Sequence, residues 1–180
     1  MKRFLSVVLC FVFAFAFVGC KENTSGKNGH SVDVEYYANL GQISDVDYKL
    51  GDSVSSVKEV LEKNVDEDGD TAYFDYESGE YTVMTDGTVC CCYKTDDSSA
   101  GITHIVKYGD AYGFSVGTVS TQVRDTMSEA GFDSEERDAR PGELFFLPSG
   151  ADTSVLEYDF DKATVLFIFQ QNALSAAVIY

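Results

Sequence analysis

Residues 51–57 have the sequence Gly-Asp-Ser-Val-Ser-Ser-Val, and the pattern returns 62 residues later as Gly-Phe-Ser-Val-Gly-Thr-Val at residues 113–119. In each copy the glycine allows the chain to turn, and the serine that follows, Ser53 or Ser115, is a residue type favoured at the N-cap of a helix. The repeat therefore predicts two helices that begin in the same way.

Apolar residues continue from each serine at helical spacing, which predicts one apolar face per helix. Asn64 and Gly131 are residue types that commonly end a helix. The apolar positions are Val54, Val57 and Leu61 in the first copy and Val116, Val119, Val123 and Met127 in the second.

Runs rich in β-branched and aromatic residues follow each predicted helix, with the tight-turn pairs Ser78-Gly79 and Asp86-Gly87 between some of them. The charged stretch 133–142 is predicted to be an exposed loop. We therefore predict an α+β fold in which two tandem helix-then-β-meander repeats, residues 48–112 and 113–180, form one antiparallel sheet with the helices packed on one face. The predicted strands are 72–76, 81–85, 88–93 and 102–108, then 143–147, 155–160, 164–169 and 174–180.

The helix starts and one strand motif carry a resemblance to a known fold. Phe74-Asp75-Tyr76 in the first repeat is echoed by Tyr158-Asp159-Phe160 in the second. With the Gly-x-Ser-Val starts, this pattern resembles the fold of β-lactamase-inhibitor proteins and of small outer-membrane assembly lipoproteins of the SmpA/OmlA type. The resemblance covers roughly residues 48–180. Members of this group bind other proteins or have no assigned role, which is all that the resemblance implies, because a fold alone does not establish a function.

The N-terminus has the anatomy of an export signal. Lys2 and Arg3 precede an apolar run over residues 4–18, which is shorter than the roughly 20 residues that a membrane-spanning helix needs. Its end, Phe17-Val18-Gly19-Cys20, resembles the lipobox of bacterial lipoproteins. The resemblance implies that residues 1–19 are removed and that Cys20 carries the lipid.

The residues after Cys20 predict a connection between the anchor and the domain. Residues 21–32 are polar with two glycines, which favours a flexible tether, and residues 34–40 are predicted to form a short strand. We therefore assign residues 20–47 to the lipidated cysteine, the tether and a lead-in segment.

The charge of the chain limits its partners. The 13 Lys and Arg include Lys2 and Arg3, so the part after residue 19 carries 11 basic against 30 acidic residues, a formal net charge of −19. Such a chain repels nucleic acid and anionic lipid headgroups. The expected partners are the membrane, through the lipid on Cys20, and another envelope or extracellular protein.

The sequence contains no arrangement that predicts catalysis. Three adjacent cysteines, Cys90, Cys91 and Cys92, cannot form a disulfide framework and are predicted to alternate between the faces of a strand. His104 lies in a predicted strand with no motif around it. We expect no enzyme activity and no cofactor.

The run Thr164–Phe169 (TVLFIF) is apolar at every position after the first, so both sides of the sheet are expected to be apolar there. A face left uncovered would be a docking surface, unless sheet curvature, residues 33–48 or a second copy of the chain covers it. The residues proposed for this binding face are Tyr73, Tyr81, Tyr158, Phe167 and Phe169.

Two alternative functions rest on acidic turns. Asp66, Asp68, Asp70 and Glu77 match four positions of a calcium-binding loop, although Thr71 stands where such loops need glycine. The Asp86-Gly87 hairpin tip would suit an inhibitor loop. The main prediction is a membrane-anchored, extracytoplasmic, non-catalytic protein-binding or envelope-assembly module; the alternatives are an inhibitor of an extracellular enzyme and a calcium or small-ligand sensor.

Overall fold

The computed structural model describes residues 29–62, 71–76, 79–140, 143 and 152–180. Within these ranges, the side chains of residues 29–32, 62, 71–76, 79 and 80 are not described. Several predictions therefore lie outside the described residues. They are the signal and lipid anchor at residues 1–20, the calcium loop at Asp66, Asp68, Asp70 and Glu77, the Ser78-Gly79 turn, and the strand at 143–147 apart from Glu143, which is not in a strand.

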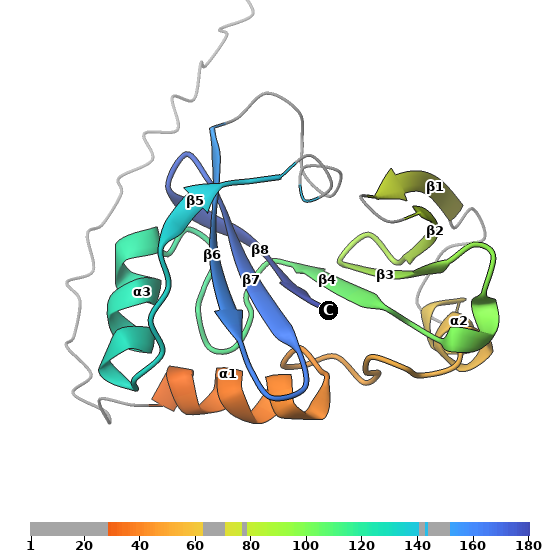
Figure 1. Ribbon diagram of the computed structural model, residues 1–180, viewed down its shortest axis with the longest axis horizontal. Coiled ribbons are helices and arrows are strands. Elements are labelled where there is room, and N and C mark those ends of the chain that lie inside the picture. The colour runs from red at the N-terminus through yellow and green to blue at the C-terminus, as the bar shows by residue number, and fades with distance from the viewer. Residues whose placement is uncertain (1–28, 63–70, 77–78, 141–142, 144–151) are drawn as a thin grey trace, which may run out of the picture.

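One eight-stranded antiparallel sheet organises the chain, in the order β1-β2-β3-β4-β8-β7-β6-β5 (Figure 1). Neighbours in sequence pair as hairpins or meanders, and β4 pairs with β8 to join the first four strands to the last four. The α+β class and the antiparallel sheet are thus as predicted. The strands are β1 (Thr71–Tyr76), β2 (Gly79–Thr85), β3 (Val89–Lys94), β4 (His104–Tyr108), β5 (Glu136–Asp138), β6 (Thr153–Asp159), β7 (Thr164–Gln170) and β8 (Ala173–Ile179).

The first helix, α1 (Gly29–Leu40), corrects a prediction, because residues 34–40 were expected to form a strand and residues up to 32 a tether. Val34 and Ala38 lie one helical turn apart and are fully buried. The helix ends at Gly41 (φ 73°), with the Gln42 N–H donating to the Tyr37 carbonyl at 2.9 Å. This is the arrangement by which a glycine in the left-handed region closes a helix. The sequence does not distinguish this helix from a strand, because a short apolar run suits both.

The second helix, α2 (Val54–Glu62), is as predicted. The N–H of Ser56 donates to Ser53 Oγ at 3.2 Å, so Ser53 caps the first turn. Gly51 turns the chain with φ 82°, and Val57 and Leu61 are buried.

The third helix, α3 (Ser120–Glu129), begins later than predicted. Gly117 lies at φ 86°, outside the helical region, and interrupts the run that was expected to start at Val116. Val116 and Val119 are consequently 57% and 40% exposed, whereas Val123 is fully buried. Gly131 ends the helix as predicted, with φ 92°.

Both faces of the sheet are packed. The larger cluster, here the helix-side cluster, contains strand residues together with buried residues of the three helices, such as Val34, Val57 and Val123. Residues of the other face form the opposite-face cluster, whose members come from β2, β3, β4 and β6–β8. They are Tyr81, Val83, Cys90, Cys92, Val106, Val155, Leu166, Ile168, Ala176 and Val178, all at most 7% exposed.

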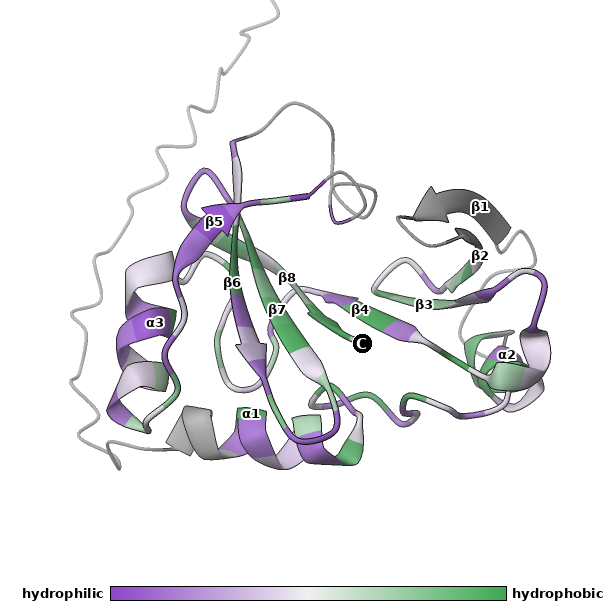
Figure 2. Ribbon diagram, in the orientation of Figure 1, coloured by the Kyte–Doolittle hydropathy of each residue, from purple (hydrophilic) through white to green (hydrophobic). Residues whose placement is uncertain are grey.

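The charged stretch 133–142 corrects another prediction, since it is not only a loop. Residues Glu136–Asp138 form β5, which pairs with β6 at the edge of the sheet, with Arg137 opposite Val155. Figure 2 shows β5 as hydrophilic, whereas β7 and β8 are hydrophobic along much of their length. Charged residues on an edge strand oppose its pairing with strands of other chains.

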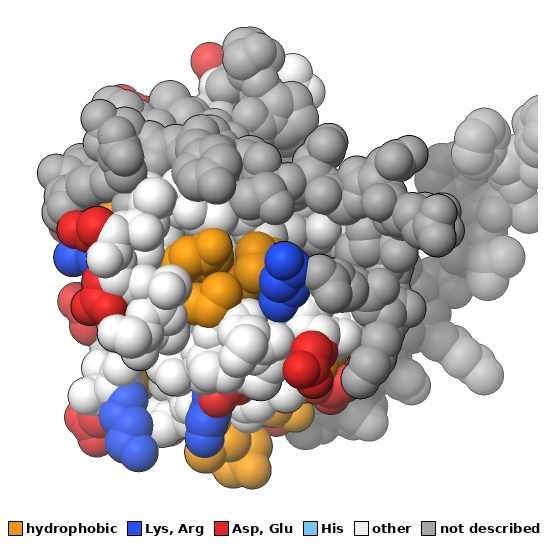
Figure 3. All heavy atoms as spheres, turned by 90° about the vertical axis from the view of Figure 1, so that its right-hand side faces the viewer, with side chains coloured by type: hydrophobic (Ala, Val, Ile, Leu, Met, Phe, Trp, Pro, Cys, Tyr) orange, Lys and Arg blue, Asp and Glu red, His pale blue; other side chains and the backbone are white. Residues whose placement is uncertain are grey.

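Exposed large hydrophobic residues are few over the described ranges: Tyr36, Leu40, Val116 and Val119. Figure 3 shows one side of the molecule, where small hydrophobic patches lie among acidic and basic side chains. None of the helices in the described part of the chain is long and apolar enough to cross a membrane.

The sequence places Val116 and Val123 on the same helix face, but α3 begins after Val116. The two valines should therefore contribute differently to stability. Val123→Ala should lower the free energy of unfolding by about 2 kcal/mol, from about 0.8 kcal/mol per buried carbon removed plus a cavity contribution. Val116→Ala should change it by less than about 0.5 kcal/mol, because Val116 is exposed. Urea unfolding measures both, and equal losses would contradict the observed helix start.

Candidate functional site

The predicted binding face does not exist as one surface. Tyr158, Phe167 and Phe169 are at most 2% exposed and belong to the helix-side cluster, where the Tyr158 and Phe167 rings meet at 6.0 Å. Tyr81 is 4% exposed and belongs to the opposite-face cluster, and the side chain of Tyr73 is not described. Tyr81, Tyr158, Phe167 and Phe169 are therefore core residues and do not form the predicted docking face.

The predicted binding face is absent because side chains on both faces of the sheet are buried. Of the covers considered for the apolar sheet, the segment after α1 does contribute, since Ile43, Val46 and Tyr48 are buried, but they lie in the helix-side cluster. Ser44 fixes this segment by accepting a hydrogen bond from the Tyr112 N–H at 2.6 Å. Lys107 Nζ adds a bond to the Ser44 carbonyl at 2.9 Å. The opposite-face cluster is buried although it contains no residue of this segment.

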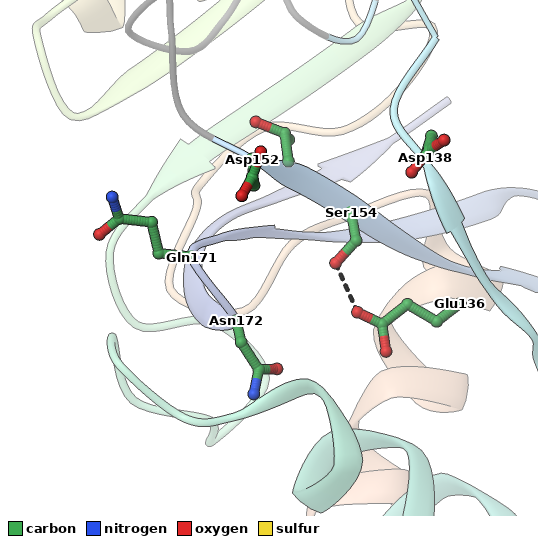
Figure 4. A pocket seen from close by; sticks show the side chains of 7 residues that line it. Glu136, Asp138, Asp152, Ser154, Gln171 and Asn172 are labelled. Carbon is green, nitrogen blue, oxygen red and sulfur yellow. Dashed lines mark hydrogen bonds between the residues drawn. The ribbon is translucent and has the colours of Figure 1, made fainter.

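A polar pocket of about 400 Å³ lies where β5, the start of β6 and the β7–β8 turn converge (Figure 4). Its lining offers three carboxylates, two amides and two hydroxyls, with no lysine, arginine or histidine. Such a lining accepts hydrogen bonds and favours positive charge. The lining residues are Glu136, Asp138, Asp152, Thr153, Ser154, Gln171 and Asn172.

One side of the pocket is the turn between β7 and β8, which is fixed by a contact between residues far apart in the chain. Gln171 (φ 51°) and Asn172 (φ 63°) form the two-residue turn between β7 and β8. Asn172 Oδ1 accepts a hydrogen bond from the Ser120 N–H at 3.2 Å, and so supplies the cap that α3 lacks from its own N-cap residue. A residue 52 positions away thus fixes the helix start to the hairpin tip.

Both carboxylate oxygens of Glu136 are hydrogen-bonded to serine hydroxyl groups around the pocket. Ser120 Oγ, in a side chain only 2% exposed, lies 2.8 Å from Glu136 Oε2 and 2.8 Å from Asn172 Oδ1. The Ser154 hydroxyl donates to the other carboxylate oxygen, as the dashed line in Figure 4 shows. The carboxylates left to meet a ligand are therefore those of Asp138 and Asp152. Among the residues that the structure describes, no three His, Cys, Asp or Glu side chains are grouped closely enough to hold a metal ion.

A partly buried ion network lies beside β5. The Arg137 guanidinium binds Glu143 with two hydrogen bonds of 2.7 and 2.9 Å, and Glu157 with two of 2.6 and 3.0 Å. Glu143 is 2% exposed and also accepts the Arg140 N–H at 2.6 Å. Burial acts to raise the pKa of Glu143, but the bonds from Arg137 and Arg140 outweigh it and lower the pKa. The network is a structural tie between β5, β6 and residue 143.

His104 is packed between two tyrosines. Its ring stacks on Tyr180 at 5.4 Å and meets the edge of Tyr81 at 5.4 Å, and its Nδ1 lies 2.9 Å from Thr103 Oγ1. Burial lowers the pKa of His104 to about 4, so the imidazole is neutral at pH 7. An imidazole of such low basicity is a weak general base at neutral pH.

The three cysteines lie as predicted, with Cys91 in the helix-side cluster and Cys90 and Cys92 in the opposite-face cluster. All are free thiols, at most 7% exposed. Burial raises the pKa of each thiol, and Cys90 donates a hydrogen bond to Tyr108 Oη at 3.7 Å. Thiols in this state are poor nucleophiles.

The Asp86-Gly87 turn joins β2 and β3 as predicted, with Gly87 at φ 86°. Asp86 Oδ1 accepts hydrogen bonds from the N–H groups of Thr88 and Val89, both at 2.8 Å, and from the Thr88 hydroxyl. Burial raises the pKa of Asp86, but these bonds lower it overall. The carboxylate is thus engaged in holding its own turn.

Comparison with known proteins leaves the chain without a family. No protein-family model matches it, and no curated protein or solved structure is detectably similar to it. The resemblance drawn from the short helix and strand motifs stays a prediction. Function has to be argued from the residues themselves.

The Arg137–Glu143 pair predicts a pH-dependent stability. Glu143→Gln should lower the free energy of unfolding at pH 7 by about 2 kcal/mol, because the charge-assisted hydrogen bonds of Arg137 to Glu143 are weakened while Glu157 still pairs with Arg137. Folding lowers the pKa of Glu143, so its contribution is complete above the ordinary value of 4.5 and is lost as pH falls through the folded-state value. Urea unfolding at pH 7 and pH 3 should show a difference between wild type and variant that shrinks at the lower pH.

The exposed Glu135 provides the control for this measurement. Glu135→Gln should have little effect at either pH, because surface charges contribute little. A Glu143→Gln loss that is equally large at pH 3 would contradict the role of the ionised carboxylate.

Thiol titration tests the buried cysteines. In residues 21–180, which contain only Cys90, Cys91 and Cys92, Ellman's reagent at pH 8 should find no rapidly reacting thiol in the folded protein. All three thiols should react once urea unfolds the chain. Rapid reaction of one thiol in the folded protein would show that its strand opens to solvent.

Proposed function

We propose that the chain is a membrane-anchored, extracytoplasmic lipoprotein that acts as a non-catalytic protein-binding or envelope-assembly module. The anchoring part rests on the N-terminal pattern: Lys2, Arg3, the apolar residues 4–18 and the Gly19-Cys20 pair. Helix α1 begins at Gly29, which leaves eight residues, 21–28, between the proposed anchor and the folded domain.

The observation that carries the non-catalytic part is the state of the groups that usually perform chemistry. His104 is neutral and lies between two aromatic rings, and the three cysteines are buried thiols with raised pKa values. Arg137 is paired with two carboxylates. Each of these groups serves packing or pairing, which is what a binding module needs from its interior.

Charge indicates the kind of partner. A net charge of −19 beyond the signal, from 11 basic and 30 acidic residues, favours a partner with a basic surface. The polar pocket gathers Asp138 and Asp152 beside amide and hydroxyl groups, and such a lining suits a basic side chain. The inhibitor and calcium alternatives rest on the Asp86-Gly87 turn and on residues 66–77, and they stay predictions.

We also propose that the domain is a tandem repeat with its helices packed on one face. The sheet order supports this, because the four strands after α2 and the four after α3 run outward in opposite directions from the β4–β8 pair. The equivalent glycines Gly51 and Gly113 adopt nearly the same φ, 82° and 81°. In this arrangement α3 starts later than α2 because Gly117 replaces Ser55 of the first copy.

Cys20→Ser tests the anchor. The wild-type protein should sediment with membranes and yield an N-terminal peptide that starts at Cys20 and carries lipid mass in mass spectrometry. The Cys20→Ser variant should lack the lipid and leave the membrane fraction. A wild-type peptide without lipid would refute the proposed anchoring.

Cross-linking in intact cells, followed by mass spectrometry, tests binding. The anchored protein should recover a defined protein neighbour, and Asp138→Asn with Asp152→Asn should reduce that recovery severalfold, because two pocket charges are lost. Asp96→Asn with Asp125→Asn removes the same charge at exposed positions elsewhere and should have a smaller effect. Recovery of no neighbour above background would refute the binding function, whereas equal effects of the two double variants would remove only the pocket from it.

A further inference from the structure

Helix α1 carries apolar residues on two opposite sides. Val34 and Ala38 face the core and are fully buried, whereas Tyr36 and Leu40, four residues apart, are 60% and 44% exposed. Residues four apart lie on the same side of a helix, so Tyr36 and Leu40 form one outward stripe. We call these two residues the α1 stripe.

The other two helices do not share this feature. On both, every exposed residue that the structure describes is polar or charged. The stripe is therefore a property of the helix nearest to the N-terminus and not of helices in this fold generally. The exposed positions are Ser55, Ser56, Lys58 and Glu59 on α2, and Thr121, Gln122, Asp125, Ser128 and Glu129 on α3.

The place of α1 in the chain indicates what meets the stripe. Gly29 follows Cys20 by nine residues, a distance of at most about 30 Å even in a fully extended chain. If Cys20 holds the lipid, α1 is the first part of the domain that the bilayer can reach. Tyrosine and leucine suit the boundary between headgroups and acyl chains, because the ring and the aliphatic group enter while the hydroxyl stays hydrated.

We propose that the α1 stripe, Tyr36 and Leu40, lies against the lipid surface and orients the anchored domain. This inference rests on the proposed lipid anchor. Asp33 and Glu35 flank the stripe and are exposed, so the contact is shallow and best made with lipids of zero net charge.

This orientation would point the polar pocket away from the membrane. In Figure 1, β5 and the β7–β8 turn lie at the end of the sheet remote from α1. The pocket formed by these elements would then face outward, where a protein partner can approach. The lipid contact would thus present the acidic pocket and keep most of the negative charge off the bilayer.

The test uses the absence of tryptophan from the sequence. Tyr36→Trp and Leu40→Trp each place a single fluorescent reporter on the stripe, and Val116→Trp places one at a site of matched exposure, 57% against 60% for Tyr36. Each full-length variant is expressed in a bacterium, purified from membranes in detergent and reconstituted into phosphatidylcholine vesicles with brominated acyl chains. Mass spectrometry of the N-terminal peptide establishes whether Cys20 carries lipid.

The expected result is severalfold stronger quenching at positions 36 and 40 than at position 116 in the lipidated protein. Two stripe reporters are used so that one still decides the matter if the other disturbs the helix. Lipidated protein with equal or weaker quenching on the stripe overturns this inference and leaves the anchor intact. Protein without lipid on Cys20 overturns the proposed anchor and this inference with it.

Discussion

The pairing of β4 with β8 is the contact on which the rest of the structure depends. It aligns Ile105 with Ile179 and Val106 with Val178, residues more than 70 positions apart in the chain. The first pair faces the helix-side cluster and the second the opposite-face cluster. Without this pairing, each group of four strands would have an open apolar edge and half a core. With it, both layers of the interior run continuously across the sheet.

A sheet that is apolar on both sides limits where polar groups can lie. Charged side chains that enter the interior need partners, because an unpaired buried charge is costly. Arg137 and Glu143 meet this requirement at the β5 edge, where the network adjoins Ala139 and Tyr180 at the margin of the opposite-face cluster. His104 needs no charged partner, because its imidazole is neutral at pH 7 and lies between aromatic rings. Recognition chemistry is therefore left to edges, turns and helix surfaces.

The sequence predicted elements that neighbouring residues define. It did not predict features that depend on contacts between residues far apart in the chain. Strand β7 was predicted to within one residue, because a short continuous apolar run rich in β-branched and aromatic residues is typical of a buried strand. Helix α3 begins later than the repeat predicts, because Gly117 leaves the helical region at the position that Ser55 occupies in the first copy. The polar pocket could not be predicted, since it depends on Asn172 reaching Ser120 across 52 positions. The binding-face prediction failed because it assumed one sheet face would remain uncovered.

The failure of that prediction changes where a partner should be sought. If Tyr158, Phe167 and Phe169 had been exposed, an apolar partner lying flat on the sheet would have explained them. Their burial removes the large apolar surface. The described residues retain an acid-lined pocket at one end of the sheet and a few exposed apolar residues, two of which lie on α1. A pocket of carboxylates and amides selects by charge, whereas a tyrosine and a leucine on a helix select by hydrophobicity. The two proposed contacts, with a lipid surface and with a basic protein, would each use one of these features.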